Sequence, residues 1–251
     1  MPQVLVGTKI VDIDLIVFDK DGTLIDFFYL WGQKARQSIE TLVARVEGDN
    51  ALLQAICARL GCDLGNNRVV SDSDMACATI ADVHQATRQV LCDWGLSIEQ
   101  AELATQTHFT SILMALPDVD MIRPIGSLNK FLQDCQQIGI KIGVVTSDYR
   151  AGTQFALETL DISAWVDVLV CGDDALTSKP SPAPVLHIAT QCQIKPQRMM
   201  VVGDSSSDLL MGKNAGVACC VGVLTGTGTQ ESLQRYADIV VESIADIQII
   251  S

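Results

Sequence analysis

The sequence predicts an α/β protein in which an all-helical cap domain is inserted into a doubly wound parallel sheet. Three observations support this prediction. Short apolar runs recur along the 251 residues, helical patterns separate most of them, and one long stretch has a helical pattern almost throughout. Strands that alternate with helices form βαβ units, which place helices on both faces of a parallel sheet.

The apolar runs are typical of strands that are buried on both faces. The first run, DLIVFD at 14–19, ends in an acidic residue. We expect it to begin the sheet of a Rossmann-like core. The later runs lie at 140–147, 166–174, 198–204, 219–224 and 239–242.

The segments between the later runs have the periodicity of helices. Each is short, as the crossover connections of a parallel sheet are. The expected helices are Tyr149–Leu160, Pro182–Cys192, Ser206–Ala215 and Glu231–Tyr236.

Residues 25–123 break this alternation. Apolar residues at 39, 42, 43 and 46 recur at the spacing of one helix face, and residues 52–60 repeat the pattern. Turn-forming residues at 61–74 interrupt the stretch with a loop. We therefore expect an α/β catalytic core made of 1–24 and 124–251, and a helical cap domain at 25–123.

The charge balance limits the partners. Acidic residues outnumber basic ones, 30 against 17, which gives a formal net charge of −13. Such a surface repels nucleic acid and anionic lipid, so we expect no nucleic acid or membrane partner. The N-terminal residues lack the pattern of a secretory signal, and the nine cysteines form no CxxC pair. We expect a cytoplasmic protein with reduced thiols.

Polar residues follow three of the predicted strands. They are Asp19 and Asp21 after the first, Thr146 and Ser147 after the second, and the segment 203–208 after the fourth. Ligands of parallel sheets bind at the carboxyl ends of the strands. Carboxylates, hydroxyls and the Lys179 ammonium, from a loop before a helix, should therefore meet at one edge.

Carboxylates that meet at one edge repel each other unless a cation neutralises them. At about 4 Å and an effective dielectric constant near 20, one like-charge pair costs about 4 kcal/mol. Mg²⁺ prefers oxygen ligands and is commonly held by one or two carboxylates. With a lysine and a threonine nearby, the site suits phosphoryl transfer, in which Asp19 attacks phosphorus and Asp21 acts as general acid and base.

These segments carry a resemblance to a known family. The residues DKDGT at 19–23, Thr146, Lys179 and GDSSSD at 203–208 are similar, in order and context, to the four motifs of the haloacid dehalogenase-like hydrolase superfamily. The whole chain most resembles its phosphoglycolate phosphatases, which have a helical cap between the first two motifs.

The resemblance implies a role for each matching residue. Asp19 would be the aspartyl nucleophile and a Mg²⁺ ligand, and Asp21 would be the acid/base and lend its backbone carbonyl to the metal. Asp204 would bind Mg²⁺ directly, with Asp208 behind it. Phosphate-binding roles would fall to Thr146, the Ser147 amide and Lys179.

The implied function is Mg²⁺-dependent hydrolysis of a small phosphomonoester through an aspartyl-phosphate intermediate. A phosphosugar mutase would use the same core residues, and a non-catalytic binding module could retain the same fold. A dehalogenase would not need Asp21. A phosphonoacetaldehyde hydrolase would need a cap lysine, and Lys34 is the only lysine between 25 and 123.

Three further features have ordinary structural interpretations. Lys20 alternates away from its neighbours, which favours a packing or surface role. The stretch LTGTGTQ at 224–230 lacks a full phosphate-binding motif and is typical of a strand-to-helix loop. Arg68, in the cap loop, is expected to be solvated, although it is the candidate for reading the far end of an anionic substrate.

Overall fold

The computed structural model describes residues 2–70 and 73–250. The chain divides into two compact units. The α/β unit consists of Met1–Phe27 together with Ile122–Ser251, and the helical unit consists of Phe28–Met121.

The α/β unit is built on a parallel sheet of six strands, in the order β10-β9-β8-β3-β6-β7. The strand of this sheet that comes first in the sequence, β3, lies inside the sheet, and the order of the strands reverses there. This confirms the predicted doubly wound α/β fold. The strands are β3 (Leu15–Phe18), β6 (Lys141–Val145), β7 (Val168–Val170), β8 (Met199–Gly203), β9 (Cys219–Val223) and β10 (Ile239–Val241).

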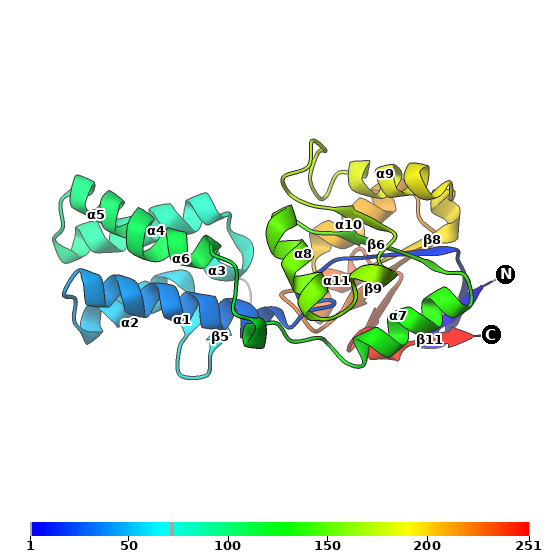
Figure 1. Ribbon diagram of the computed structural model, residues 1–251, viewed down its shortest axis with the longest axis horizontal. Coiled ribbons are helices and arrows are strands. Elements are labelled where there is room, and N and C mark those ends of the chain that lie inside the picture. Colours follow the sequence, from blue (N-terminus) through cyan, green and yellow to red (C-terminus); the bar gives the residue numbers. More distant parts are fainter. Residues whose placement is uncertain (1, 71–72, 251) are drawn as a thin grey trace. The chain divides into compact units, whose positions relative to one another are not determined.

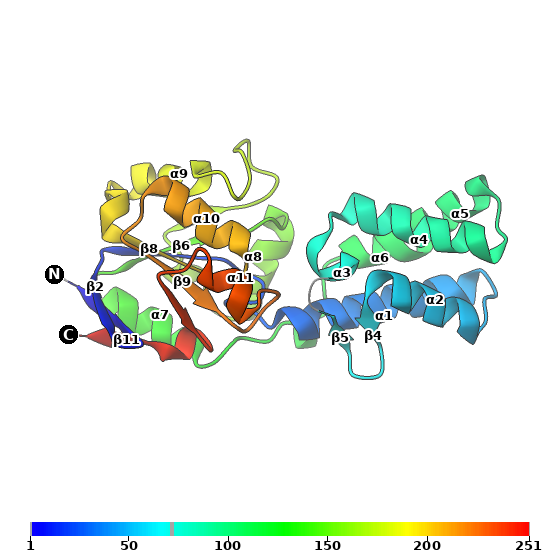
Figure 2. The ribbon, with the colours of Figure 1, turned by 180° about the vertical axis from the view of Figure 1, so that it is seen from behind.

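Helices cover both faces of this sheet. Figures 1 and 2 show α9 and α10 together on one side and α7 on the other. The helices of the unit are α7 (Leu128–Gln137), α8 (Arg150–Thr159), α9 (Ala183–Cys192), α10 (Ser206–Ala215) and α11 (Gln230–Gln234), with 3₁₀ turns η3 (Ser163–Trp165), η4 (Pro196–Arg198) and η5 (Ile244–Asp246).

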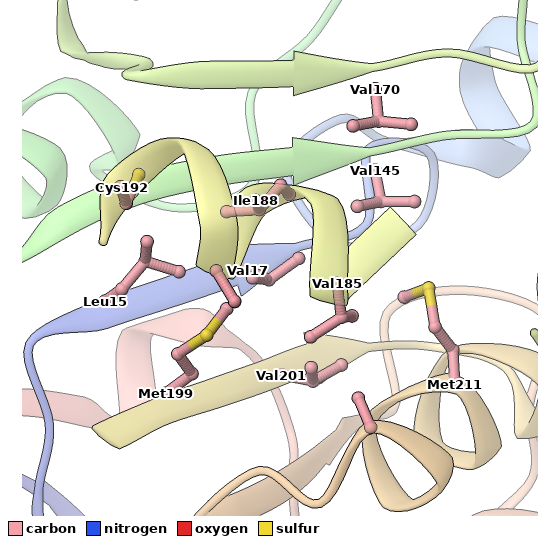
Figure 3. Packing of buried hydrophobic residues seen from close by; sticks show 12 residues of the cluster. Leu15, Val17, Val145, Val170, Val185, Ile188, Cys192, Met199, Val201 and Met211 are labelled. Atoms are coloured by element: carbon pink, nitrogen blue, oxygen red, sulfur yellow. The ribbon is translucent and has the colours of Figure 1, made fainter. Parts of the chain in front are cut away.

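The side chains of β3 fix this strand from both faces. Leu15 and Val17 pack in a cluster with residues of α9, α10 and β8, among them Ile188 (Figure 3). On the opposite face, the Phe18 ring meets the Phe131 ring of α7 edge to face, with 6.0 Å between the ring centroids. All four residues of β3 are buried. The residues that directly follow β3, beginning with Asp19, are therefore attached to a strand that is packed on both faces.

A second, three-stranded antiparallel sheet joins the two ends of the chain. It consists of β1 (Gln3–Val6), β2 (Lys9–Asp12) and β11 (Ile247–Ile250), with β1 in the middle. Figure 2 shows the two termini side by side at this sheet. No pattern in the sequence predicts this sheet. Strands of four residues give little periodicity, and β11 pairs with a segment more than 240 residues away.

Among the described residues, the helical unit contains eight helical segments and one short hairpin. They are α1 (Phe27–Arg45), α2 (Asn50–Leu60), β4 (Cys62–Asp63), β5 (Arg68–Val69), α3 (Asp74–Cys77), α4 (Ile80–Trp94), α5 (Ile98–Thr105), the π-helix η1 (Gln106–Thr110), α6 (Ser111–Met114) and the 3₁₀ turn η2 (Val119–Met121). No helix among the described residues combines the length and the apolar character that a transmembrane span requires.

The stretch 61–74, expected as a loop, contains the hairpin β4–β5; residues 71 and 72 lie outside the described residues. The hairpin packs closely on α1. A Cβ added to Gly32 of α1 would lie 2.1 Å from the Asn67 carbonyl oxygen, so this contact requires glycine. The Arg36 side chain also donates to Asn67 Oδ1 at 2.5 Å.

Candidate active site

The carboxyl ends of three neighbouring strands bring the predicted polar residues together. Asp19 follows β3, Thr146 follows β6 and Asp204 follows β8, and β3 lies between the other two strands. The Asp19 amide donates to the Val202 carbonyl of β8 at 2.9 Å. The side chains of Asp19, Thr146 and Asp204 are all buried. The sheet itself therefore sets the spacing of these groups.

Lys179 closes the site from the loop before α9. Its Nζ lies 2.6 Å from Asp19 Oδ1 and 2.7 Å from Asp208 Oδ1. Only 7% of the lysine side chain is exposed. Burial opposes its charge, but Asp19 and Asp208 outweigh this and raise the pKa of the ammonium. Lys179 is thus a permanent cation between two buried carboxylates.

Three buried carboxylates form one cluster. Asp19, Asp204 and Asp208 each have an oxygen within 4.8 Å of those of the other two. Burial raises the pKa of Asp19 to about 7; Asp208 and Asp21 add to the rise, and Lys179 opposes it. Burial, followed by the charges of Asp19 and Asp208, also raises the pKa of Asp204 well above its ordinary value. One lysine is not enough to neutralise this cluster.

The cluster fits a divalent cation. Asp19 Oδ2 is buried, yet it has no hydrogen-bond partner among the residues that the structure describes. An unpartnered buried oxygen is costly unless a ligand completes it. The donors are all carboxylate oxygens, which hard cations such as Mg²⁺ prefer. Asp19 and Asp204 are thus suitable ligands.

The stretch 224–230 holds Asp204 in place. Asp204 Oδ2 accepts hydrogen bonds from the Thr227 amide at 2.7 Å and from Thr227 Oγ1 at 3.2 Å. The Gly228 amide donates to the Asp204 carbonyl at 2.9 Å. A Cβ at Gly226 would lie 2.0 Å from Asp204 Oδ2, so only glycine allows this approach. The interpretation as an ordinary connecting loop missed this role, because the repeated glycines and threonines do not indicate which carboxylate they surround.

Asp208 is fixed by the start of α10. Its Oδ2 accepts from Ser205 N at 3.1 Å and from Ser205 Oγ at 2.6 Å, in a capping box at the helix N-terminus. Its other oxygen is bound by Lys179. Asp208 therefore orients Lys179 within the cluster.

Thr146, Ser147 and Lys179 line one small cavity, together with Gly172 and other residues near the strand ends. Thr146 is buried and its Oγ1 accepts from the Asp148 amide at 3.1 Å, whereas Ser147 is exposed. The residues expected to hold a phosphoryl group thus lie around a common space.

The side chain of Asp21 has an unexpected partner. Both of its oxygens are bound by Lys20 Nζ, at 2.8 and 2.7 Å. Lys20 was expected to have a packing or surface role, but it is buried and paired with charged groups. The alternation along a strand predicts the direction in which a side chain leaves the backbone. The lysine side chain is long enough for its ammonium group to reach back to the neighbouring Asp21.

Arg68 belongs to the helical unit. It lies in β5 and is exposed, and its guanidinium carbon is 5.1 Å from the centre of the Phe28 ring. This cation–π contact orients the guanidinium without using its hydrogen-bond donors.

Comparison with known proteins matches the chain to a family. A family model described as haloacid dehalogenase-like hydrolase matches residues 13–216. The phosphoglycolate phosphatase of Escherichia coli K12 is 35% identical over 113 residues, which is 45% of this chain and 44% of that enzyme. The validoxylamine A 7′-phosphate phosphatase of Streptomyces hygroscopicus subsp. limoneus is 31% identical over 53% of this chain and 62% of its own length. The matches thus span less than two thirds of these relatives.

Solved structures share the fold over nearly the whole chain. A predicted phosphoglycolate phosphatase from Haemophilus somnus has a TM-score of 0.63 at 20% identity, covering 93% of this chain and 96% of its own. A candidate β-phosphoglucomutase from Thermotoga maritima has a TM-score of 0.64 at 19% identity, with coverages of 91% and 94%. At these identities the likeness shows the fold alone.

Proposed function

The chain belongs to the haloacid dehalogenase-like hydrolase family, and on this premise we propose that it is a Mg²⁺-dependent phosphatase of a small phosphomonoester. The observation that carries the proposal is the contact between Lys179 Nζ and Asp19 Oδ1 at 2.6 Å, beside the buried carboxylate cluster. Phosphoglycolate phosphatase is the name of one relative, and a phosphoglycolate-like ester is the substrate that we propose here.

Asp19 is the proposed nucleophile. Its carboxylate attacks phosphorus, the bond from phosphorus to the ester oxygen breaks, and an aspartyl phosphate forms. Water then attacks the phosphorus, which releases inorganic phosphate and returns the carboxylate. The carboxylate is held for this attack by Lys179 on one oxygen, while the other oxygen has no described hydrogen-bond partner.

The remaining residues divide the other tasks. Asp21 gives a proton to the leaving oxygen and later takes one from the attacking water. Thr146 Oγ1, the Ser147 amide and the Lys179 ammonium hold the phosphoryl oxygens, as positioned donors do in phosphoryl transfer. Support for this division comes from the small cavity that Thr146, Ser147 and Lys179 line.

Asp19, Asp204 and the Asp21 backbone carbonyl are the proposed ligands of Mg²⁺, with Asp208 behind them. When bound, the cation would neutralise charge on the carboxylates and on the phosphoryl group. Support comes from the raised pKa values of Asp19 and Asp204, because a cation offsets the repulsion that causes part of both shifts.

The helical unit is the proposed cap domain. Within it, Arg68 is the residue that we propose binds an anionic group on the leaving group. Support comes from the exposed guanidinium, which lies against the face of the Phe28 ring. A second anionic group on a phosphomonoester, such as a carboxylate, would suit its donors.

A turnover screen tests the proposed function. Small phosphomonoesters, 2-phosphoglycolate among them, are incubated with the protein, and released inorganic phosphate is measured with Mg²⁺, with Ca²⁺ and with chelator. We expect release with Mg²⁺ only, because Ca²⁺ takes looser, longer coordination that would misplace Asp19. Asp19→Asn is the matched control and should release none. Isomerised sugar phosphate without phosphate release would indicate the mutase instead.

A further inference from the structure

Lys20, between Asp19 and Asp21 in the sequence, is a buried cation that the proposed mechanism does not use. Its Nζ contacts both carboxylate oxygens of Asp21, at 2.8 and 2.7 Å, and lies 3.2 Å from Asp148 Oδ2. The lysine side chain is 2% exposed, whereas the side chains of Asp21 and Asp148 are 15% and 30% exposed.

Packing alone does not explain a lysine at this position. An apolar side chain could fill the same space without the cost of burying an ammonium group. The ammonium group of Lys20 instead forms ion pairs with Asp21 and Asp148. The charge is therefore retained for the two carboxylates that it contacts.

Asp148 provides a fixed anchor for this lysine. Its amide donates to Thr146 Oγ1 at 3.1 Å, and its carbonyl accepts from the Gly172 amide at 2.8 Å. Its Oδ1 accepts from the Tyr149 amide at 2.8 Å, which leaves Oδ2 for Lys20. Lys20 thus connects Asp21, which follows β3, to the loop that carries Thr146.

We propose that Lys20 is a positioning residue, which aims the carboxyl group of Asp21 at the leaving oxygen and is itself anchored by Asp148. The inference rests on the proposed function, in which Asp21 protonates that oxygen. Because Nζ reaches both oxygens of Asp21, it can hold one of them while the other meets the leaving group. The contact with Lys20 then restricts rotation of the Asp21 side chain while its carboxyl group protonates the leaving oxygen.

The dependence on the leaving group tests this role. An alkyl alkoxide needs a proton to depart, whereas p-nitrophenolate departs without one, so only the alkyl ester depends on a well-aimed Asp21. We expect Lys20→Met, which has a similar length and no charge, to lower kcat/KM for glycerol 2-phosphate at least 10-fold more than for p-nitrophenyl phosphate. A role confined to packing would lower both values by the same factor.

Two further variants complete the experiment. In an Asp21→Asn background, Lys20→Met should produce no further selective loss, because the group that it positions is gone. Asp148→Asn keeps the contact between Lys20 and Asp21 and weakens its anchor, so a smaller selective loss of about 3-fold is expected. Circular dichroism and the melting temperature show whether Lys20→Met folds. If it does not fold, kcat/KM for the two esters is compared in Asp148→Asn instead.

The outcomes separate this inference from the proposed function. If the wild-type protein hydrolyses neither p-nitrophenyl phosphate nor any alkyl ester of the screen, 2-phosphoglycolate included, with Mg²⁺, the proposed function is wrong, and the role of Lys20 falls with it. If the wild-type protein is active but Lys20→Met, or Asp148→Asn in its place, slows both esters equally, only the role of Lys20 is overturned. A selective loss that persists in the Asp21→Asn background would also overturn it.

Discussion

The Nζ of Lys179 lies 2.6 Å from Oδ1 of Asp19, across 160 residues of sequence. Both groups are buried, and the same ammonium is 2.7 Å from Asp208. A single lysine therefore joins the end of the central strand to the start of α10. Removing Lys179 therefore leaves two buried carboxylates without the cation that they share.

Lys179→Met should destabilise the protein, because it removes the ammonium group that Asp19 and Asp208 share. Breaking a buried ion pair from one side typically costs about 3 kcal/mol, because the remaining charge is not compensated. We expect a lower melting temperature without metal, partial recovery with Mg²⁺, and at least a 100-fold loss of kcat. Lys195→Met, a lysine outside the cluster, is the matched control. An unchanged melting temperature would show that Asp19 and Asp208 do not depend on this cation.

The metal-free protein should lose stability as the pH rises toward neutrality. The pKa of Asp19 is about 7 in the folded protein, against an ordinary value of 3.8, so between these two pH values the folded state holds a proton that the unfolded state has released. Its contribution to the free energy of unfolding is present below about pH 4 and is lost as the pH approaches 7. The raised pKa of Asp204 acts in the same direction.

Thermal unfolding at pH 5 and pH 7.5 checks this dependence. Mg²⁺ should raise the melting temperature more at pH 7.5, because the ligands are then ionised without competition from protons. Asp19→Asn should reduce the difference between the melting temperatures of the metal-free protein at pH 5 and at pH 7.5. An equal effect of Mg²⁺ at both would contradict the assignment of the cluster to a metal.

Thr227 should tune metal affinity through Asp204. Groups that orient a metal-binding carboxylate typically contribute 10-fold or more to affinity. We expect Thr227→Val, which removes the hydroxyl bond but keeps the amide bond, to raise the Mg²⁺ concentration for half-maximal activity about 10-fold. Thr227→Ser keeps the hydroxyl and should behave as wild type. Identical behaviour of the two variants would indicate that only the amide matters.

Arg68 should affect substrate discrimination and leave the phosphoryl chemistry unchanged. Arg68→Ala is expected to raise KM for 2-phosphoglycolate about 10-fold more than KM for p-nitrophenyl phosphate, with kcat little changed, because it removes a charge-assisted contact to the leaving group. Arg88→Ala, whose guanidinium is paired with Glu102, is the matched control within the helical unit. Equal changes for both substrates would make Arg68 an ordinary solvated residue.

Sequence patterns predicted the part of the fold that is locally encoded. Buried parallel strands such as β3 and β8 consist of continuous apolar residues, and the acids that follow them stand at their ends. The antiparallel sheet of β1, β2 and β11 was missed, because its strands are short and its pairing is non-local. The hairpin β4–β5 was missed for the first of these reasons.

In the site, residue types were predictable but the contacts between side chains were not. A sequence shows that Lys20 and Thr227 exist, but only the folded chain brings Lys20 to Asp148 and Thr227 to Asp204. Both contacts cross between segments far apart in the sequence, and neither leaves a periodic signal.

Trapping the phosphorylated intermediate tests directly whether Asp19 is the nucleophile. The protein is mixed with substrate and Mg²⁺, quenched rapidly in acid and treated with borohydride, which reduces an acyl phosphate of aspartate to homoserine. Mass spectrometry of the digested protein then locates the change. We predict homoserine at position 19, dependent on substrate and absent from Asp19→Asn. Substrate turnover with an unmodified Asp19 in the quenched wild-type protein, or homoserine at another aspartate, would contradict the account.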